Sequence, residues 1–245
     1  MKIGFIVLAT LAAATLVLEP AMAASQREVA SETRSLSGFH RIDVQGEFDV
    51  TLVQGSTESV TIEAPAAVIP KVVTDVRNGT LSIAVRSDRG LWNWLSGRGL
   101  SKPVRVTINL RDLDVIEGAG AFNLDADTLM VNELRLDIAG ASKLRIRDLQ
   151  AKRIVLDGSG TIKAQIGGTA ARQHVDISGA GTYDAGQLVS DEVAIEVSGA
   201  GKAVVHAKNT LSVDISGAGV VEYIGDPKLS QTISGIGQVR RREGS

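Results

Sequence analysis

The chain has 245 residues, a formal net charge of −2, no cysteine, and only 3% aromatic residues beside 26 glycines. The near-zero charge argues against a nucleic-acid-binding protein, which needs a basic surface. The lack of cysteine excludes disulfides, thiol catalysis and cysteine-ligated metals. A composition dominated by aliphatic residues fits a narrow interior, one or two side chains wide, better than the thick core of an ordinary globular domain.

The first 23 residues predict a secretory signal peptide. Lys2 supplies the charged start, an apolar stretch covers residues 3–18, and Ala21-Met22-Ala23 is a small-residue cleavage site. The apolar stretch is too short for a membrane span, and we expect no other span in the chain. The protein is therefore predicted to be exported to the periplasm, the outer surface or the medium. A cysteine-free exported chain fits a Gram-negative periplasmic or secreted protein.

The next part of the chain predicts a leader and a set of short strands. Residues 24–37 are polar and predict a flexible leader, and apolar residues then alternate across residues 42–52 around Gly46. Asn78-Gly79 divides two apolar runs within residues 72–85, which predicts a hairpin or two successive sides of a coil. A further strand is expected over residues 104–110.

Residues 87–102 interrupt this pattern with an apolar segment that contains both tryptophans of the chain. Trp92 and Trp94 lie close to the basic residue Arg98, and these three residues are the candidate binding residues. One interpretation is a loop that contacts a protein, a glycan or a membrane surface. The other is an apolar flap that covers strand edges of the fold. The sequence slightly favours the flap.

The second half of the chain repeats one motif seven times. Each copy consists of an apolar residue, any residue, a glycine and then a small residue. The glycines stand at positions 118, 140, 158, 179, 199, 217 and 235. A period near twenty that is carried by strand-forming residues and glycines predicts a solenoid in which each repeat is one coil.

Aligning the repeats on these glycines predicts the faces of each coil. The positions two before and four after the glycine are apolar in every repeat, so two strands should meet at a glycine corner with their inward faces opposed. Coils should stack in parallel at roughly 4.8 Å and wind right-handedly. The predicted fold is an all-β, right-handed parallel β-helix with a less regular N-terminal β section. It forms a single domain over residues 38–242, with repeats over about 111–239.

An outward column of acidic residues stands three positions before the aligned glycine. It contains Asp137, Asp176, Glu196 and Asp214 and is interrupted by Val155. Acids on neighbouring coils could attract a cation, so Asp176, Glu196 and Asp214 are weak candidates for metal ligands. A solvated outer face is the favoured interpretation, and we predict no metal and no cofactor. Since no nucleophile elbow, P-loop or zinc-protease motif occurs, no catalytic residue is predicted either.

Several segments together resemble a known bacterial family. They are GFHRIDVQGEFDVTLVQG at residues 38–55, VVTDVRNGTLSIAV at 72–85, VRVTINL at 104–110, and the repeated ISGAG corners. In this order they are similar to the DUF2807 family, the "putative auto-transporter adhesin, head GIN domain", over about residues 38–239. The resemblance implies an exported bacterial protein with a β-helical fold, and it brings no catalytic motif.

The predicted function is that of a non-enzymatic, exported β-solenoid that acts as an adhesion-type binding module or scaffold of the cell envelope. Its expected partner is an envelope glycan or protein. The alternative is a polysaccharide-active β-helix enzyme that uses the outward carboxylates. A purely structural role through self-association is the third hypothesis, and the oligomeric state stays open.

Overall fold

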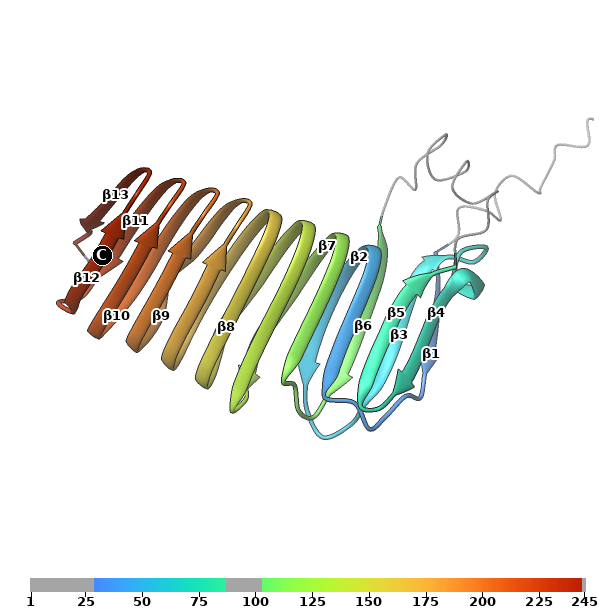
Figure 1. Cartoon of the computed structure of the whole chain (residues 1–245). Helices are drawn as coiled ribbons and strands as arrows, with labels where there is room; N and C mark the ends of the chain where they lie inside the picture. Colours follow the sequence, from blue (N-terminus) through green and yellow to red (C-terminus); the bar gives the residue numbers. More distant parts are fainter. Residues whose placement is uncertain (1–28, 87–102, 244–245) are drawn as a thin grey trace, which may run out of the picture.

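The computed structural model describes residues 29–86 and 103–243 and shows an elongated stack of coils (Figure 1). The predicted signal peptide and the segment 87–102 lie outside the described residues. The described strands are β1 (Val29–Arg34), β2 (Arg41–Gln54), β3 (Ser59–Pro65), β4 (Val72–Arg77), β5 (Thr80–Val85), β6 (Val104–Leu110), β7 (Val115–Met130), β8 (Glu133–Ile177), β9 (Ala180–Val197), β10 (Ala200–Ile215), β11 (Ala218–Ile224), β12 (Lys228–Ile233) and β13 (Ile236–Arg241). The short 3-10 helix η1 (Ile69–Lys71) precedes β4.

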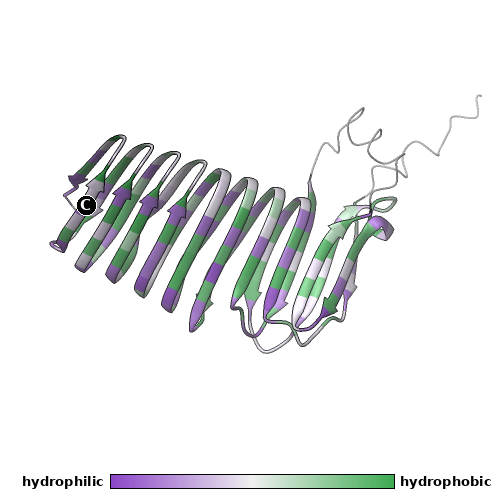
Figure 2. Cartoon of the chain, in the orientation of Figure 1, coloured by the Kyte–Doolittle hydropathy of each residue, from purple (hydrophilic) through white to green (hydrophobic). Residues whose placement is uncertain are grey.

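β2 and all strands from β7 to β13 pair with their neighbours in parallel. β2 pairs β7, β7 pairs β8, β8 pairs β9, β9 pairs β10, and β10 pairs both β11 and β12. Along these strands hydrophobic and hydrophilic residues alternate (Figure 2). The inward residues form one continuous aliphatic core through the stack. The predicted parallel β-solenoid is confirmed.

The N-terminal end is built differently, with antiparallel strands beside the first coil. β1 pairs β3, β3 pairs β6, and β4 pairs β5 as a hairpin through Asn78-Gly79. Both turn residues have positive φ, as this type of tight turn requires. The predicted hairpin and the less regular N-terminal β section are thus confirmed.

The structure corrects part of the predicted flexible leader, residues 24–37, of which it describes residues 29–37. Val29–Arg34 forms strand β1, which lies antiparallel to β3. The Arg34 guanidinium donates to the carbonyl oxygen of Val72 at 2.7 Å and to Thr74 Oγ1 at 2.9 Å. These contacts come from residues about forty positions away, so the polar local sequence did not indicate them.

A single column of glycines forms the corner of every coil. Its members are Gly46, Gly120, Gly140, Gly160, Gly179, Gly199, Gly217 and Gly235. From Gly120 onward, a Cβ atom added to any of them would lie 2.0–2.7 Å from the backbone oxygen of the preceding corner. Only glycine therefore allows the coils to approach this closely.

This column corrects the alignment on the motif glycines in two coils. In the first and third repeats the corner is Gly120 and Gly160, not Gly118 and Gly158. Gly118 instead pairs with Val44 on one side and Ile138 on the other, in the inward column two positions before the corner.

Side-chain volume explains the difference. Where a glycine occupies this inward column, the residue two positions after the corner is large and fills the space. A Cβ on Gly118 would lie 2.1 Å from Cζ of Phe122. From β8 onward, where a branched residue occupies the column, the residue two positions after the corner is small. In the pair Val197 and Gly201, a Cβ on the glycine would lie 3.1 Å from Val197 Cγ1. From Gly120 onward each corner thus holds one large side chain, whereas the corner at Gly46 buries both Val44 and Phe48.

A polar cluster lies inside the hydrophobic core, which is otherwise mostly aliphatic. The hydroxyl of Tyr183 donates to Gln173 Oε1 at 3.0 Å, and Gln173 Nε2 donates to Ser190 Oγ at 2.7 Å and to the Leu188 carbonyl at 3.1 Å. The three side chains are buried and all of them are hydrogen-bonded. Burial raises the pKa of Tyr183, so its hydroxyl stays protonated.

The two ends of the stack differ. Every residue of β12 is exposed, and Ile236 at the start of β13 is 86% exposed. Ile233, predicted to be inward, is 39% exposed because no coil follows it among the described residues.

No helix in residues 29–86 or 103–243 is long or apolar enough to span a membrane.

Candidate functional site

The corrected register changes the outward column of acidic residues. Three positions before the corner glycine stand Asp43, Glu117, Asp137, Asp157, Asp176, Glu196 and Asp214. We call this column the acidic ladder. It holds an acid in every coil from β2 to β10, and the interruption expected at Val155 does not exist.

The strand registers establish the ladder. Glu117 pairs with Asp43 and Asp137, and Glu196 pairs with Asp176 and Asp214. Asp157 falls in the same column because Gly160, three residues later, lies directly against Gly140. Neighbouring carboxylates are thus about one strand spacing, ~4.8 Å, apart along the stack.

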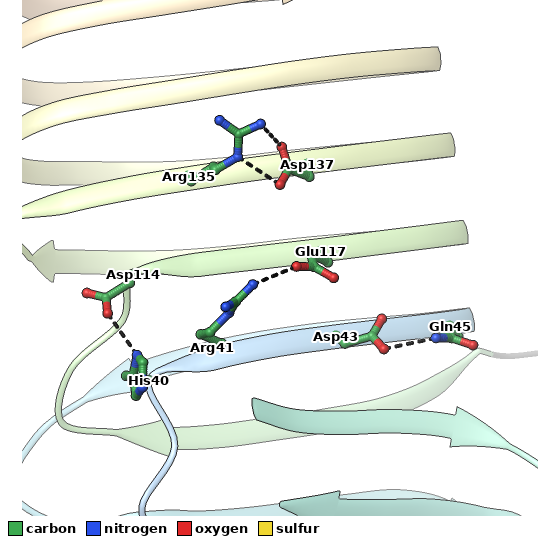
Figure 3. Close-up of polar contacts among 8 residues, drawn as sticks. All are labelled: His40, Arg41, Asp43, Gln45, Asp114, Glu117, Arg135 and Asp137. Carbon is green, nitrogen blue, oxygen red and sulfur yellow. Dashed lines mark hydrogen bonds and ion pairs between the residues drawn. The ribbon is translucent and has the colours of Figure 1, made fainter. Parts of the chain in front are cut away.

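In the N-terminal half of the ladder, two arginines that stand two positions before an acid of their own coil form ion pairs with three of the four acids, while Asp43 accepts a hydrogen bond from Gln45 (Figure 3). Arg41 Nη2 lies 3.0 Å from Glu117 Oε1, and Arg135 Nε donates to Asp137 Oδ2 at 2.9 Å. Arg135 also forms an ion pair with Asp157 on the following coil. The hydrogen bond to Asp137 is the main cause that raises the pKa of Arg135.

The C-terminal half of the ladder has no such cations. At the positions equivalent to Arg41 and Arg135, the last three acidic coils carry His174, Ala194 and Ser212. Among the described residues, no ion pair involves the acids of this half, Asp176, Glu196 and Asp214. We call these three acids the open acidic row.

A shallow hollow of about 570 Å³ lies beside the open acidic row. The small side chains of Ala194, Ser212 and Ser230 leave this space on the outer face. Its far side is bordered by the next outward column, which includes Arg172 and Glu192. The face therefore offers carboxylates, hydroxyls and the cations of Arg153, Arg172 and Lys228 around the hollow.

The open acidic row suits contact with a partner better than binding of a metal ion. No group of three acidic or histidine side chains in the described ranges could hold a metal ion. The carboxylates project side by side from a flat sheet, and like charges placed opposite each other on neighbouring strands destabilise a sheet. A partner that supplies cations or hydrogen-bond donors would relieve this repulsion.

The structure describes three of the six predicted site residues. It brings Asp176, Glu196 and Asp214 into one row, whereas Trp92, Trp94 and Arg98 lie outside the described residues. The sequence alignment missed Asp43, Glu117 and Asp157 as members of the ladder. The size of the residue after the corner, Phe122 or Ile162, was the signal that could have found the last two.

Comparison with known proteins agrees with this architecture. A putative adhesin from Bacteroides fragilis aligns with a TM-score of 0.73 at 20% identity, over 89% of this chain and 99% of that chain. A putative adhesin from Parabacteroides distasonis aligns with a TM-score of 0.65 at 23% identity, over 88% and 97%. A structure from the same species described as a putative lipid binding protein aligns at 0.61 and 18% identity, over 88% and 97%.

At these identities the structures show a shared fold and nothing more specific. A search of curated proteins finds no significant match. The profile of one family does match residues 38–227, which is most of the chain and includes both the N-terminal strands and the repeats. The chain therefore belongs to the family described as "putative auto-transporter adhesin, head GIN domain", DUF2807.

Proposed function

We propose that this protein is an exported, non-enzymatic binding module that attaches to a component of the bacterial cell envelope through its flat outer faces. The observation that carries the proposal is the open acidic row on a rigid solenoid, in a family named for adhesins. Stacked coils hold the three carboxylates at fixed spacing, so a partner with repeated cationic or donor groups gains several contacts at little cost in ordering.

The proposal is tested by measuring binding of the purified protein to fractionated Gram-negative envelopes. We expect the triple variant Asp176→Asn, Glu196→Gln, Asp214→Asn to bind about tenfold more weakly, since it loses three charged acceptors. The matched control is Glu117→Gln, Asp137→Asn, Asp157→Asn, which removes the same charge from the ion-paired half of the same ladder. Equal binding by the wild type and both variants would refute the role of the open row.

The predicted alternative is a polysaccharide-active enzyme, which the spacing of the acids supports. Retaining glycosidases place two carboxyl groups about 5–5.5 Å apart, close to one strand spacing. A screen of acidic and neutral polysaccharides for release of reducing ends separates the two functions. Turnover that is abolished by Asp176→Asn or Glu196→Gln would replace the binding module by an enzyme.

The predicted binding loop is tested in the same assay. Trp92→Ala together with Trp94→Ala should weaken envelope binding if these residues and Arg98 contact the partner. Unchanged binding together with a lower unfolding midpoint would favour the covering flap instead.

A further inference from the structure

A second hollow lies on the other outward face of the solenoid, after the glycine corner. Its volume is about 500 Å³, within the range of small-molecule sites. Within the part of the chain that the structure describes, six polar residues, four aliphatic residues and two glycines line it: Arg145, Arg147, Gln165, Asp184, Gln187, Arg242, Ile146, Ile166, Val204, Ile224, Gly167 and Gly186. The lining therefore combines hydrogen-bonding groups with a short apolar surface.

A bulge in β9 creates this hollow. The register between β8 and β9 shifts between Gln165 and Gly168, and the register between β9 and β10 shifts at the same level. Both registers skip Gly186 and Gln187, and the Gly186 N–H makes a long contact of 3.4 Å to Asp184 Oδ1. Bulges of this kind redirect side chains and recur beside functional sites.

The arginines of the hollow are held in place by acids of the preceding coil. Arg145 Nε donates to Asp125 Oδ2 at 2.6 Å, and Arg147 forms ion pairs with Asp125 and Asp127. A guanidinium carries five N–H donors, so these pairs leave donors unused. Because the side chains are already ordered, binding an anion would cost little further entropy.

Of the other polar groups of the hollow, Arg242 forms an ion pair with Glu222, and Asp184 accepts the long hydrogen bond from the Gly186 N–H. Neither Gln165 nor Gln187 makes a hydrogen bond to another described residue, and Asp184 forms no ion pair within them. Two exposed lysines, Lys143 and Lys163, stand in the adjacent outward column, also without an ion pair to a described residue. The hollow thus offers free amides, one carboxylate and several cations around an apolar patch.

We propose that this hollow binds a carboxylate-bearing sugar unit of an acidic glycan. Guanidinium groups bind carboxylates through paired hydrogen bonds, and the amides and Asp184 suit the hydroxyls of a sugar ring. Val204 and Ile224 would contact the apolar face of the ring. A lipid chain fits this lining less well, because half of the lining residues are polar and only four are aliphatic. The site lies on the opposite face from the acidic ladder, so it goes beyond the function proposed for that face.

The experiment is a titration of ¹⁵N-labelled protein with a galacturonate oligomer, followed by amide chemical shifts. A neutral glucose oligomer of the same length is the control ligand. We expect the acidic oligomer alone to shift the amides of Gly167, Gly186 and Gln187. Shifts confined to other coils, or no shifts with the acidic oligomer, would overturn the proposal.

Variants test the role of the arginines. Arg145→Gln with Arg147→Gln should raise the Kd for the acidic oligomer by about tenfold or more, since charge-assisted hydrogen bonds are lost. Arg41→Gln with Arg135→Gln is the matched control, because it removes two arginines that are ion-paired across coils on the other face. An equal change in Kd for both variants would refute the site.

A second variant protects the test against loss of folding. Gln165→Ala with Gln187→Ala breaks no ion pair and should raise the Kd several-fold with an unchanged unfolding midpoint. Vesicles of phosphatidylglycerol form a separate arm, and shifts of the same amides by vesicles but not by the oligomer would replace the glycan with an anionic lipid headgroup. Envelope binding that survives all hollow variants, without any oligomer binding, would reject this site and leave the function of the ladder standing.

Discussion

A volume exchange at the first glycine corner should reveal how the coils are packed. Gly118 lies in the inward column between Val44 and Ile138, and the ring of Phe122 occupies the space beside it. A Cβ on Gly118 would lie 2.1 Å from Phe122 Cζ, so Gly118→Val should overpack the core by itself. With Phe122 shortened, the same valine would match the branched residues above and below it.

The magnitudes follow from the two effects. Phe122 is 2% exposed, and Phe122→Ala should cost about 3–5 kcal/mol through lost burial and a cavity. Gly118→Val should cost about 1–3 kcal/mol or more by overpacking. If the two positions were independent, the double variant would lose about 4–8 kcal/mol. We expect a loss of only about 2 kcal/mol, because the valine fills part of the space that the ring leaves.

Urea unfolding followed by far-UV circular dichroism measures the four free energies of this cycle. Equal m-values across the series would show that the same surface is exposed in each unfolding reaction. Losses that add to within about 0.5 kcal/mol would refute the exchange of volume between these positions.

Three further predictions concern the corner, the core and the C-terminal coils. Gly199→Ala would place a Cβ 2.0 Å from the backbone oxygen of Gly179 and should cost about 3 kcal/mol or more in urea unfolding, well beyond an alanine at an exposed strand position. Tyr183→Phe removes the donor to buried Gln173 and should cost about 1–3 kcal/mol, whereas a loss near zero would show that the cluster contributes nothing. The hydrogen bond from Arg240 lowers the pKa of Glu222 in the folded protein. The stability that this ionised carboxylate contributes is therefore present above the pKa of Glu222 in the unfolded chain, and it is lost as pH falls through the lower folded pKa. The protection factors of β11 and β13, in which the pH dependence of intrinsic exchange is removed, should therefore fall as pH drops below the ordinary glutamate pKa of about 4.3 in the wild type and not in Glu222→Gln.

The local sequence pattern was enough to predict the architecture, because every coil has to meet the same structural requirements. Alternating apolar residues, a glycine at a tight corner and a period near twenty admit few arrangements other than stacked parallel coils. The hairpin at Asn78-Gly79 was equally predictable, since two adjacent residues with positive φ are a local demand of the backbone. The N-terminal strand β1 was not, because its polar residues are ordered by contacts with β3 and with residues near β4.

The candidate sites depended on the register. Moving a repeat by two residues leaves every inward side chain inward, so alternation alone cannot distinguish Gly118 from Gly120 as the corner. The acidic ladder was therefore broken in the sequence alignment and became continuous only when Glu117 and Asp157 moved into it. The second hollow was invisible, because it requires a bulge at Gly186 beside arginines from another coil.

The sequence by itself determined the solenoid, the glycine corners and the alternation of inward aliphatic with outward polar residues, because these follow from the geometry of a single strand. Tertiary structure alone decided which glycine turns each coil and which outward groups become neighbours. Both depend on how side-chain volumes share one interior, within one coil for Gly118 and Phe122 and between coils for Gly118, Val44 and Ile138.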